Sequence, residues 1–198
     1  MRASYYAELA QAAYTTTPTF GAQDSACRAI SKITADGLTI GFPGTNNAAT
    51  VLADIEADVV MVEGLGLLHH GLWKAYSTQR AKLLALNPDV IYGHSAGAGW
   101  ALIYAADLGL HGKFPRAVYA FEPPRISADA TIEDLFLDGI TELLLTKNGD
   151  DPVPEVPRLP QNWQHPAPLT YIGQDSVLEA VECHLIKNVI ESLVQAGL

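Results

Sequence analysis

The stretch Val90–Gly99, which reads VIYGHSAGAG, decides the fold of this chain. A short apolar strand candidate runs into a Gly-x-Ser-x-Gly turn and then into a helical segment rich in small residues. This order is typical of a nucleophile elbow, in which a serine sits on a sharp strand-to-helix turn. Gly93 and Gly97 suit such a turn because its backbone is strained and tightly packed. We expect Ser95 to be an exposed nucleophile, although a glycine-rich turn with an incidental serine gives the same short pattern.

Length and charge limit the possible classes of protein. A chain of 198 residues suits a single domain, so we expect one unit over residues 1–198. The 22 acidic and 12 basic residues give a formal net charge of -10, which disfavours nucleic acids and anionic membranes as partners. A transient contact with a neutral lipid surface through an apolar rim stays open.

The sequence shows no targeting segment. Glu8 interrupts the apolar run that a signal peptide needs, and the most apolar window, Val59–Leu68, is too short to span a bilayer. We therefore expect a cytoplasmic location or release by a non-Sec route. Cys27 and Cys183 are too few for a disulfide framework and lack metal-ligand spacing, so we expect free thiols. A single bridge between these two cysteines stays open.

The first third of the chain predicts a helix and a strand pair. Apolar residues at helical spacing indicate an amphipathic helix over Tyr5–Tyr14. Strand-like segments at Cys27–Thr34 and Leu38–Phe42 are joined by Ala35-Asp36-Gly37, a strong turn signal. We expect these two strands to pair antiparallel.

From residue 72 onward, helical and extended patterns alternate. The segments, in order, are a helix at Leu72–Leu86, a strand at Asp89–Tyr92, a helix at Ser95–Leu108, a strand at Ala117–Phe121, a helix at Ala130–Asp138, a strand at Ile140–Leu145, an irregular stretch at Lys147–Pro168, a strand at Leu169–Gly173 and an amphipathic helix at Glu179–Ala196. Such alternation predicts an α/β fold with a mostly parallel central sheet and helices on both faces. The long irregular stretch is a candidate wall of the functional site.

A serine nucleophile needs a histidine base and an acid, in the chain order serine, acid, histidine. Beyond the elbow stand His111, His165 and His184. His111 lies at the end of the helix that follows the serine and is most simply a surface residue. His165 lies in a stretch without a clear anchoring element. We favour His184 over an ordinary helix-face histidine, because the chain order and the need of the serine for a base both point to it.

The acid is expected after the strand that ends in Leu143–Thr146. An aspartate in the loop after a central strand suits this role, and Asp150 and Asp151 both stand there. Their Asn-Gly-Asp setting is also explained by a simple turn.

Several further motifs accompany the elbow. They are Phe42-Pro43-Gly44-Thr45, the segment His69–Tyr76, the elbow Gly93–Ala98, Phe121-Glu122-Pro123-Pro124-Arg125 and Asp151-Pro152-Val153-Pro154-Glu155-Val156-Pro157. In this order the chain resembles the class 3 lipases, the family of fungal-type triacylglycerol lipases with the α/β-hydrolase fold. The corresponding family patterns are Phe-Arg-Gly-Thr/Ser, His-x-Gly-Phe, Gly-His-Ser-Leu-Gly-Gly, Phe-Gly-x-Pro-Arg and Asp-x-Val-Pro-x-x-Pro.

The resemblance assigns roles to five residues. It implies that the nucleophile is Ser95, the base His184, the acid Asp151 rather than Asp150, and the oxyanion residue Thr45, with the main-chain N–H of Ala96 as second donor. Two preorganised donors are what an oxyanion hole requires. No cofactor and no metal are implied.

The chain also departs from the family pattern. Pro43 replaces the family arginine, so an ion pair made by that arginine is absent. The lid of the family follows the oxyanion residue, and the corresponding segment Asn46–Asp58 is short, which predicts a minimal lid, weak interfacial activation and a preference for short or medium acyl chains. We interpret His69 and His94 as structural hydrogen-bonding groups.

The sequence therefore predicts a serine carboxylic-ester hydrolase that cleaves lipid or short- to medium-chain acyl esters through an acyl-enzyme. A small-molecule ester or lipid is the expected partner, and the oligomeric state stays open. The alternatives are a phospholipase or acyltransferase with the same site, and a non-catalytic α/β-hydrolase that binds a ligand. Because a histidine base must be neutral, activity should fall as the pH drops through roughly 6–7.

Overall fold

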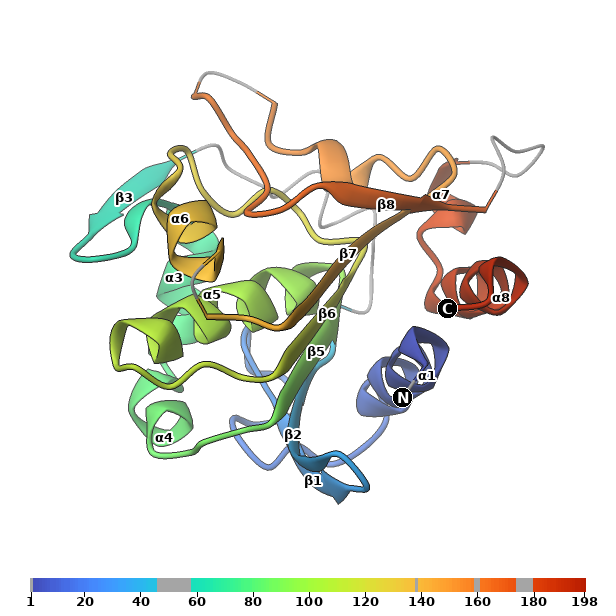
Figure 1. The fold of residues 1–198 in the computed structure, drawn as a ribbon, viewed down its shortest axis with the longest axis horizontal. Helices are drawn as coiled ribbons and strands as arrows, with labels where there is room; N and C mark the ends of the chain where they lie inside the picture. The colour runs from blue at the N-terminus through green and yellow to red at the C-terminus, as the bar shows by residue number, and fades with distance from the viewer. Residues whose placement is uncertain (1, 46–57, 138, 159–160, 174–179) are drawn as a thin grey trace.

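The centre of the computed structural model, which describes residues 2–45, 58–137, 139–158, 161–173 and 180–198, is a mostly parallel sheet (Figure 1). Its order in the described residues is β1-β2-β5-β6-β7-β8, with β1 antiparallel to β2 and the other neighbours parallel. The strands are β1 (Ile30–Thr34), β2 (Gly37–Phe42), β5 (Val90–His94), β6 (Ala117–Phe121), β7 (Glu142–Asn148) and β8 (Leu169–Ile172).

The two central strands are apolar along their whole length. Every residue of β5 and β6 is buried, as expected for parallel strands that are covered on both faces. Alternate side chains serve opposite faces, since Ile91 and Val118 pack in one cluster while Tyr92 and Tyr119 pack in the other. The predicted α/β arrangement is confirmed.

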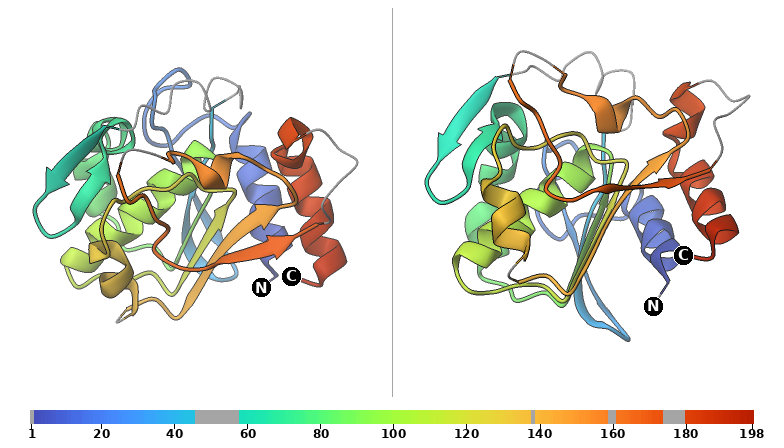
Figure 2. Two further views of the ribbon diagram at one scale, coloured as in Figure 1. Left: turned by 90° about the horizontal axis from the view of Figure 1, so that it is seen from above. Right: turned by 45° about the horizontal axis from the view of Figure 1, so that its top comes forward.

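Helices cover both faces of the sheet (Figures 1 and 2). One face carries α1 (Ala3–Ala13) and α8 (Ile186–Ala196), which lie side by side, with Ser4 N donating to Leu198 O at 3.4 Å. The other face carries α3 (His70–Ser77), α4 (Arg80–Leu84), α5 (Ala96–Leu110) and α6 (Thr131–Leu137).

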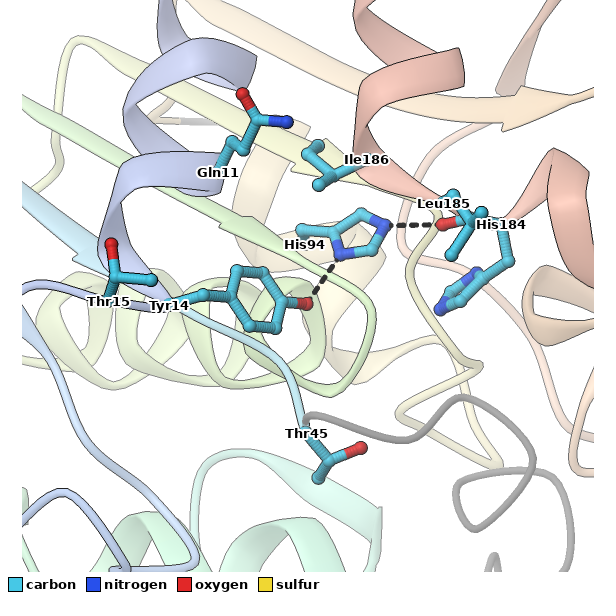
Figure 3. A pocket seen from close by; sticks show the side chains of 8 residues that line it. All are labelled: Gln11, Tyr14, Thr15, Thr45, His94, His184, Leu185 and Ile186. Atoms are coloured by element: carbon cyan, nitrogen blue, oxygen red, sulfur yellow. Dashed lines mark hydrogen bonds between the residues drawn. The ribbon is translucent and has the colours of Figure 1, made fainter.

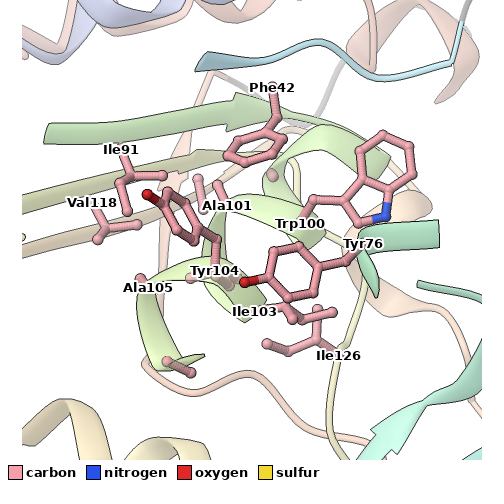
Figure 4. Close-up of a cluster of buried hydrophobic side chains, with 14 of the residues drawn as sticks. Phe42, Tyr76, Ile91, Trp100, Ala101, Ile103, Tyr104, Ala105, Val118 and Ile126 are labelled. Carbon is pink, nitrogen blue, oxygen red and sulfur yellow. The ribbon is translucent and has the colours of Figure 1, made fainter. Parts of the chain in front are cut away.

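Helix α5 lies in the middle of the core. All its residues from Ala96 to Gly109 are buried, because it is enclosed by the sheet on one side and by α3, α4 and α6 on the other. Figure 4 shows Tyr104 between Phe42 and Tyr76 in this cluster, with ring centroids 5.9 Å and 6.3 Å from theirs. The buried Tyr104 hydroxyl is satisfied by donating to Leu83 O at 2.8 Å. A helix so completely enclosed holds its N-terminus in a fixed place.

The antiparallel pair near the start of the chain is confirmed, with Thr34 opposite Gly37. Gly37 has a φ of 97°, which a glycine adopts without strain. The single helix predicted for Leu72–Leu86 is wrong, because α3 ends at Ser77 and α4 begins at Arg80. The hydroxyls of Ser77 and Thr78 donate to carbonyls of the preceding turn at 2.7 Å, and such bonds compete with helix continuation.

The predicted last helix is also interrupted. Helix α7 (Ala180–Cys183) ends just before His184, and Leu185 is extended, with φ -65° and ψ 124°, before α8 begins. The apolar window Val59–Leu68 contributes to a separate hairpin of β3 (Val59–Val62) and β4 (Gly66–His69). None of the helices in the described ranges has the length and apolarity needed to cross a membrane.

Candidate active site

Ser95 lies on the tight turn between β5 and α5. Its φ of 59° and ψ of -132° fall where residues with a side chain are strained. A Cβ on Gly93 would lie 2.3 Å from Gly97 O, and one on Gly97 would lie 2.2 Å from Phe42 O. Both glycines are therefore required by close backbone approach, as the elbow pattern predicts.

The expectation that Ser95 is exposed is wrong. The residue is 1% exposed, and in the described part of the chain its Oγ atom has no hydrogen-bond partner. The loop after β2 covers it, since a Cβ on Gly44 would lie 2.8 Å from the Ser95 Cβ. A buried hydroxyl without a partner is costly, and such atoms are found where a protein holds a reactive group.

Asp151 and His184 are hydrogen bonded. His184 Nδ1–H donates to Asp151 Oδ2 at 2.7 Å, and the main-chain N–H of Val153 donates to Oδ1 at 2.9 Å. Asp151 is fully buried and His184 nearly so. Because the carboxylate holds the proton on Nδ1, the Nε2 atom of His184 keeps a lone pair with which it can accept a proton.

His94 attaches His184 to the sheet (Figure 3). The Tyr14 hydroxyl donates to His94 Nδ1 at 2.7 Å, so the other ring nitrogen carries the proton and donates to His184 O at 2.9 Å. Burial lowers the pKa of His94 well below its usual value, which keeps the ring neutral. His69 accepts from Leu72 N at 3.3 Å and caps α3. The structural roles predicted for both histidines are confirmed.

A second hydrogen bond holds the main chain next to His184. Asn148, the last residue of β7, donates from Nδ2 to Cys183 O at 2.9 Å. The His184 segment is thus bonded at consecutive carbonyls. Sequence reasoning missed Tyr14 and Asn148, because no local pattern links residues 80 or 35 positions apart.

The other candidates have different surroundings. His111 lies at the end of α5 with a half-exposed side chain, 3.9 Å from Asp107 Oδ1. His165 donates from Nε2 to Pro154 O at 2.7 Å, and burial lowers its pKa to about 4. Asp150 is exposed. The acid that accepts the hydrogen bond from His184 is Asp151 and not its neighbour.

Ala96, the first residue of α5, follows the serine directly, and Thr45 lies three residues after the end of β2, next to Gly44 in the loop that covers the serine. The first N–H groups of a helix have no partner within it and carry partial positive charge, so this helix end favours a developing anion. The predicted lid, Asn46–Asp58, lies outside the described residues except for Asp58.

A cavity of about 300 Å³ opens beside His184. The end of α1 and the start of α8 supply most of its wall (Figure 3). The lining residues are Gln11, Tyr14, Thr15, Thr45, His94, His184, Leu185 and Ile186. The cavity is predominantly apolar and has the size of a small ligand site.

Comparison with known proteins identifies the family. The class 3 lipase family matches residues 39–161, and the chain belongs to it. The chain is 26% identical over 152 residues to secreted mono- and diacylglycerol lipase A of Penicillium cyclopium, covering 70% of this chain and 49% of that protein. It is 31% identical over 118 residues to secreted mono- and diacylglycerol lipase 1 of Fusarium solani, covering 54% and 34%.

Solved structures show the same fold. The triacylglyceride lipase of Rhizomucor miehei matches with a TM-score of 0.71 and 17% identity, over 88% of this chain and 79% of that chain. The MDLA protein of Penicillium cyclopium matches with a TM-score of 0.67 and 19% identity, over 86% and 76%. The fold is therefore that of the α/β-hydrolases.

The chain spans about half the length, or less, of the curated relatives it matches. Those fungal proteins are named as secreted, whereas a cytoplasmic location or non-Sec release of this chain stays a prediction.

Proposed function

We propose that this chain, as one domain, hydrolyses carboxylic esters of lipids, with acylglycerols as the substrate class. The observation that carries the proposal is the buried, hydrogen-bonded pair of Asp151 and His184, which His94 connects to the strained elbow of the adjacent Ser95. The mono- and diacylglycerol lipase names of its relatives support this substrate class.

The proposed reaction starts at Ser95. Its hydroxyl attacks the ester carbonyl while His184 Nε2 accepts the proton, and Asp151 stabilises the imidazolium that forms. The oxyanion is held by the N–H of Ala96 and by Thr45. Collapse of the intermediate expels the alcohol, which takes the proton from His184. Water then attacks the acyl-enzyme by the same route and releases the carboxylic acid.

The cavity beside His184 is proposed to hold the acyl chain. Its wall contains Leu185 and Ile186, and its volume of about 300 Å³ is at the lower end for ligand sites. A small apolar cavity favours short and medium chains, because a longer chain leaves apolar surface in water.

The decisive test is hydrolysis of p-nitrophenyl esters from acetate to palmitate, and of mono-, di- and trioctanoylglycerol, by the wild type and by Ser95→Ala. Ser77→Ala is the matched control, since Ser77 is an exposed serine of α3. We expect the Ser95 variant to lose at least about 10³-fold in kcat while circular dichroism stays unchanged. The control should keep full activity.

Two other outcomes would redirect the proposal. Ester synthesis that dominates when an alcohol acceptor is added would make the chain an acyltransferase. A well-folded wild type that neither hydrolyses any ester nor reacts with a fluorophosphonate probe would make it a binding protein.

A further inference from the structure

A second carboxyl group, that of Glu122, lies buried beside the proposed site. Glu122 follows β6 directly and is fully buried. Its φ of 53° is in the left-handed region, which is uncommon for a residue with a side chain. Strain at a buried acid next to a candidate site is a reason to look for a role.

Two donors from β7 hold this carboxyl group. The Thr146 hydroxyl donates to Oε1 at 2.9 Å, and the main-chain N–H of Asn148 donates to Oε2 at 2.8 Å. Asn148 is also the residue that fastens the His184 segment through Cys183 O. The position of Glu122 is therefore fixed by the same strand end that supports the proposed site.

Glu122 and Asp151 are both fully buried and both bond to the main chain of Asn148, whose N–H donates to Glu122 Oε2 and whose carbonyl accepts from Asp151 N at 3.1 Å, so the two acids lie together. Burial and the charge of Asp151 raise the pKa of Glu122 well above its usual value, against the opposing effect of the donors Asn148 and Thr146. Two buried carboxylates in contact cannot both stay ionised without a cation, so such a pair keeps a proton.

The groups around the pair decide which acid holds that proton. From β7 come only the neutral Thr146 and Asn148, and the cation of that strand, Lys147, is paired with Glu155. His184 donates to Asp151 and is itself packed against the neutral His94. Asp151 accepts the imidazole N–H, so we place the proton of the pair on Glu122, the acid whose pKa is raised.

We propose that Glu122 is a positioning residue of the Ser95–His184–Asp151 site, whose protonated carboxyl group donates a hydrogen bond to Asp151 and thereby sets the orientation and basicity of His184. The inference rests on the proposed hydrolase function. The neutral donor orients the Asp151 carboxylate and spreads its charge over two carboxyl groups. Asp151 then attracts a positively charged His184 ring less strongly than a carboxylate without this donor would.

Two substitutions distinguish the effect of a neutral hydrogen-bond donor at position 122 from the effect of its ionisable carboxyl group. Glu122→Gln keeps the shape and a neutral donor, its Oε1 can accept from Asn148, and the Thr146 hydroxyl can turn to accept from the amide. Glu122→Gly removes the carboxyl group and suits the φ of 53°. Glu142→Gln is the matched control, because Glu142 starts β7 at the opposite end of that strand and pairs with Tyr119.

The first measurement is the pH profile of kcat/KM on a soluble ester. We expect Glu122→Gly to lose about tenfold in kcat, as for one hydrogen bond to a charged group, with KM changed less than about twofold. Its acid limb should move to higher pH, and Glu122→Gln should lie between it and the wild type. An unchanged profile in the glycine variant, or an acid limb of the glutamine variant below that of the wild type, would overturn the inference.

The second measurement does not depend on activity. The pKa of Glu122 is raised in the folded protein, so at pH values between its unfolded and folded pKa the side chain loses a proton on unfolding. The free energy of unfolding therefore falls as the pH rises through this range. The Tm of Glu122→Gln minus that of the wild type should therefore grow from about pH 5 to about pH 8. A constant difference would show that folded Glu122 is ionised. If the wild type hydrolyses no ester, the proposed function fails while this measurement still tests the carboxyl pair.

Discussion

The ring of His94 holds the carbonyl of His184 at 2.9 Å, although the two residues are 90 positions apart in the chain. The two rings also pack together, with centroids 4.8 Å apart. The residue before the proposed nucleophile therefore positions the main chain of the proposed base. A substitution that moves either ring should therefore affect both the serine elbow and the position of His184.

The first prediction concerns Tyr14, whose hydroxyl donates to His94 Nδ1. Tyr14→Phe leaves this buried ring nitrogen without a donor and so loosens the ring whose other nitrogen donates to His184 O. We expect kcat to fall about three- to tenfold and the free energy of unfolding to fall by about 1 kcal/mol. Ester hydrolysis and urea unfolding measure the two effects. Tyr171→Phe, at an exposed tyrosine, is the control and should change neither.

The second prediction concerns the hydroxyl of Thr45. Thr45→Ala should lower kcat by about 10²–10³ if this hydroxyl stabilises the oxyanion, and Thr45→Ser should restore most of the rate. Because Thr45 is exposed, the stability should change by less than about 0.5 kcal/mol. Steady-state kinetics and thermal unfolding check both statements. An alanine variant with full kcat would remove the hydroxyl from the mechanism.

The third prediction concerns the close packing of the elbow. Gly97→Ala places a Cβ 2.2 Å from Phe42 O, which the backbone must move to accommodate. We expect a loss of about 1–3 kcal/mol in stability and a large loss of activity. Gly71→Ala is the control, because Gly71 is an exposed residue of α3 whose added Cβ would lie 3.3 Å from its nearest atom. Alanine there should be neutral or stabilise by up to about 1 kcal/mol. Equal Tm values for the two variants would contradict this account of the elbow.

The fourth prediction concerns the size of the cavity beside His184. Ile186→Trp should fill much of its volume of about 300 Å³. Hydrolysis of octanoate and longer esters should then fall at least about tenfold relative to acetate, since about 0.8 kcal/mol is lost for each methylene left outside. Ile186→Val, which enlarges the cavity slightly, should keep or extend the preferred chain length. If both variants keep the profile of the wild type, the acyl chain binds elsewhere.

The sequence predicts the central fold well because local patterns and burial agree there. The apolar strands β5 and β6 and the glycines around Ser95 are recognisable without any long-range information. The two broken helices could not be predicted. Near His184 the tertiary bonds to Asp151 and His94 outweigh the helical pattern, and near Ser77 the hydroxyls compete for carbonyls.

The partners of the site were harder to predict than its principal residues. The roles of Ser95, Asp151 and His184 follow from chain order and family resemblance and stay predictions, although the structure does bring Asp151 and His184 together. Glu122 was seen only as part of a matched motif. A glutamate where the family pattern has glycine was the available signal, but its contact with Asp151 depends on how β6 and β7 pair.

The break between α7 and α8 affects how the site comes into being during folding. His184 lies between these two helices, beyond the edge strand β8 in the chain, and is held by bonds that span 33 and 90 positions. Contacts of such long sequence separation form late, because the intervening loop must first be closed. A refolding molecule should thus regain its far-ultraviolet circular dichroism before its esterase activity, with an interval in which the serine elbow exists and has no base.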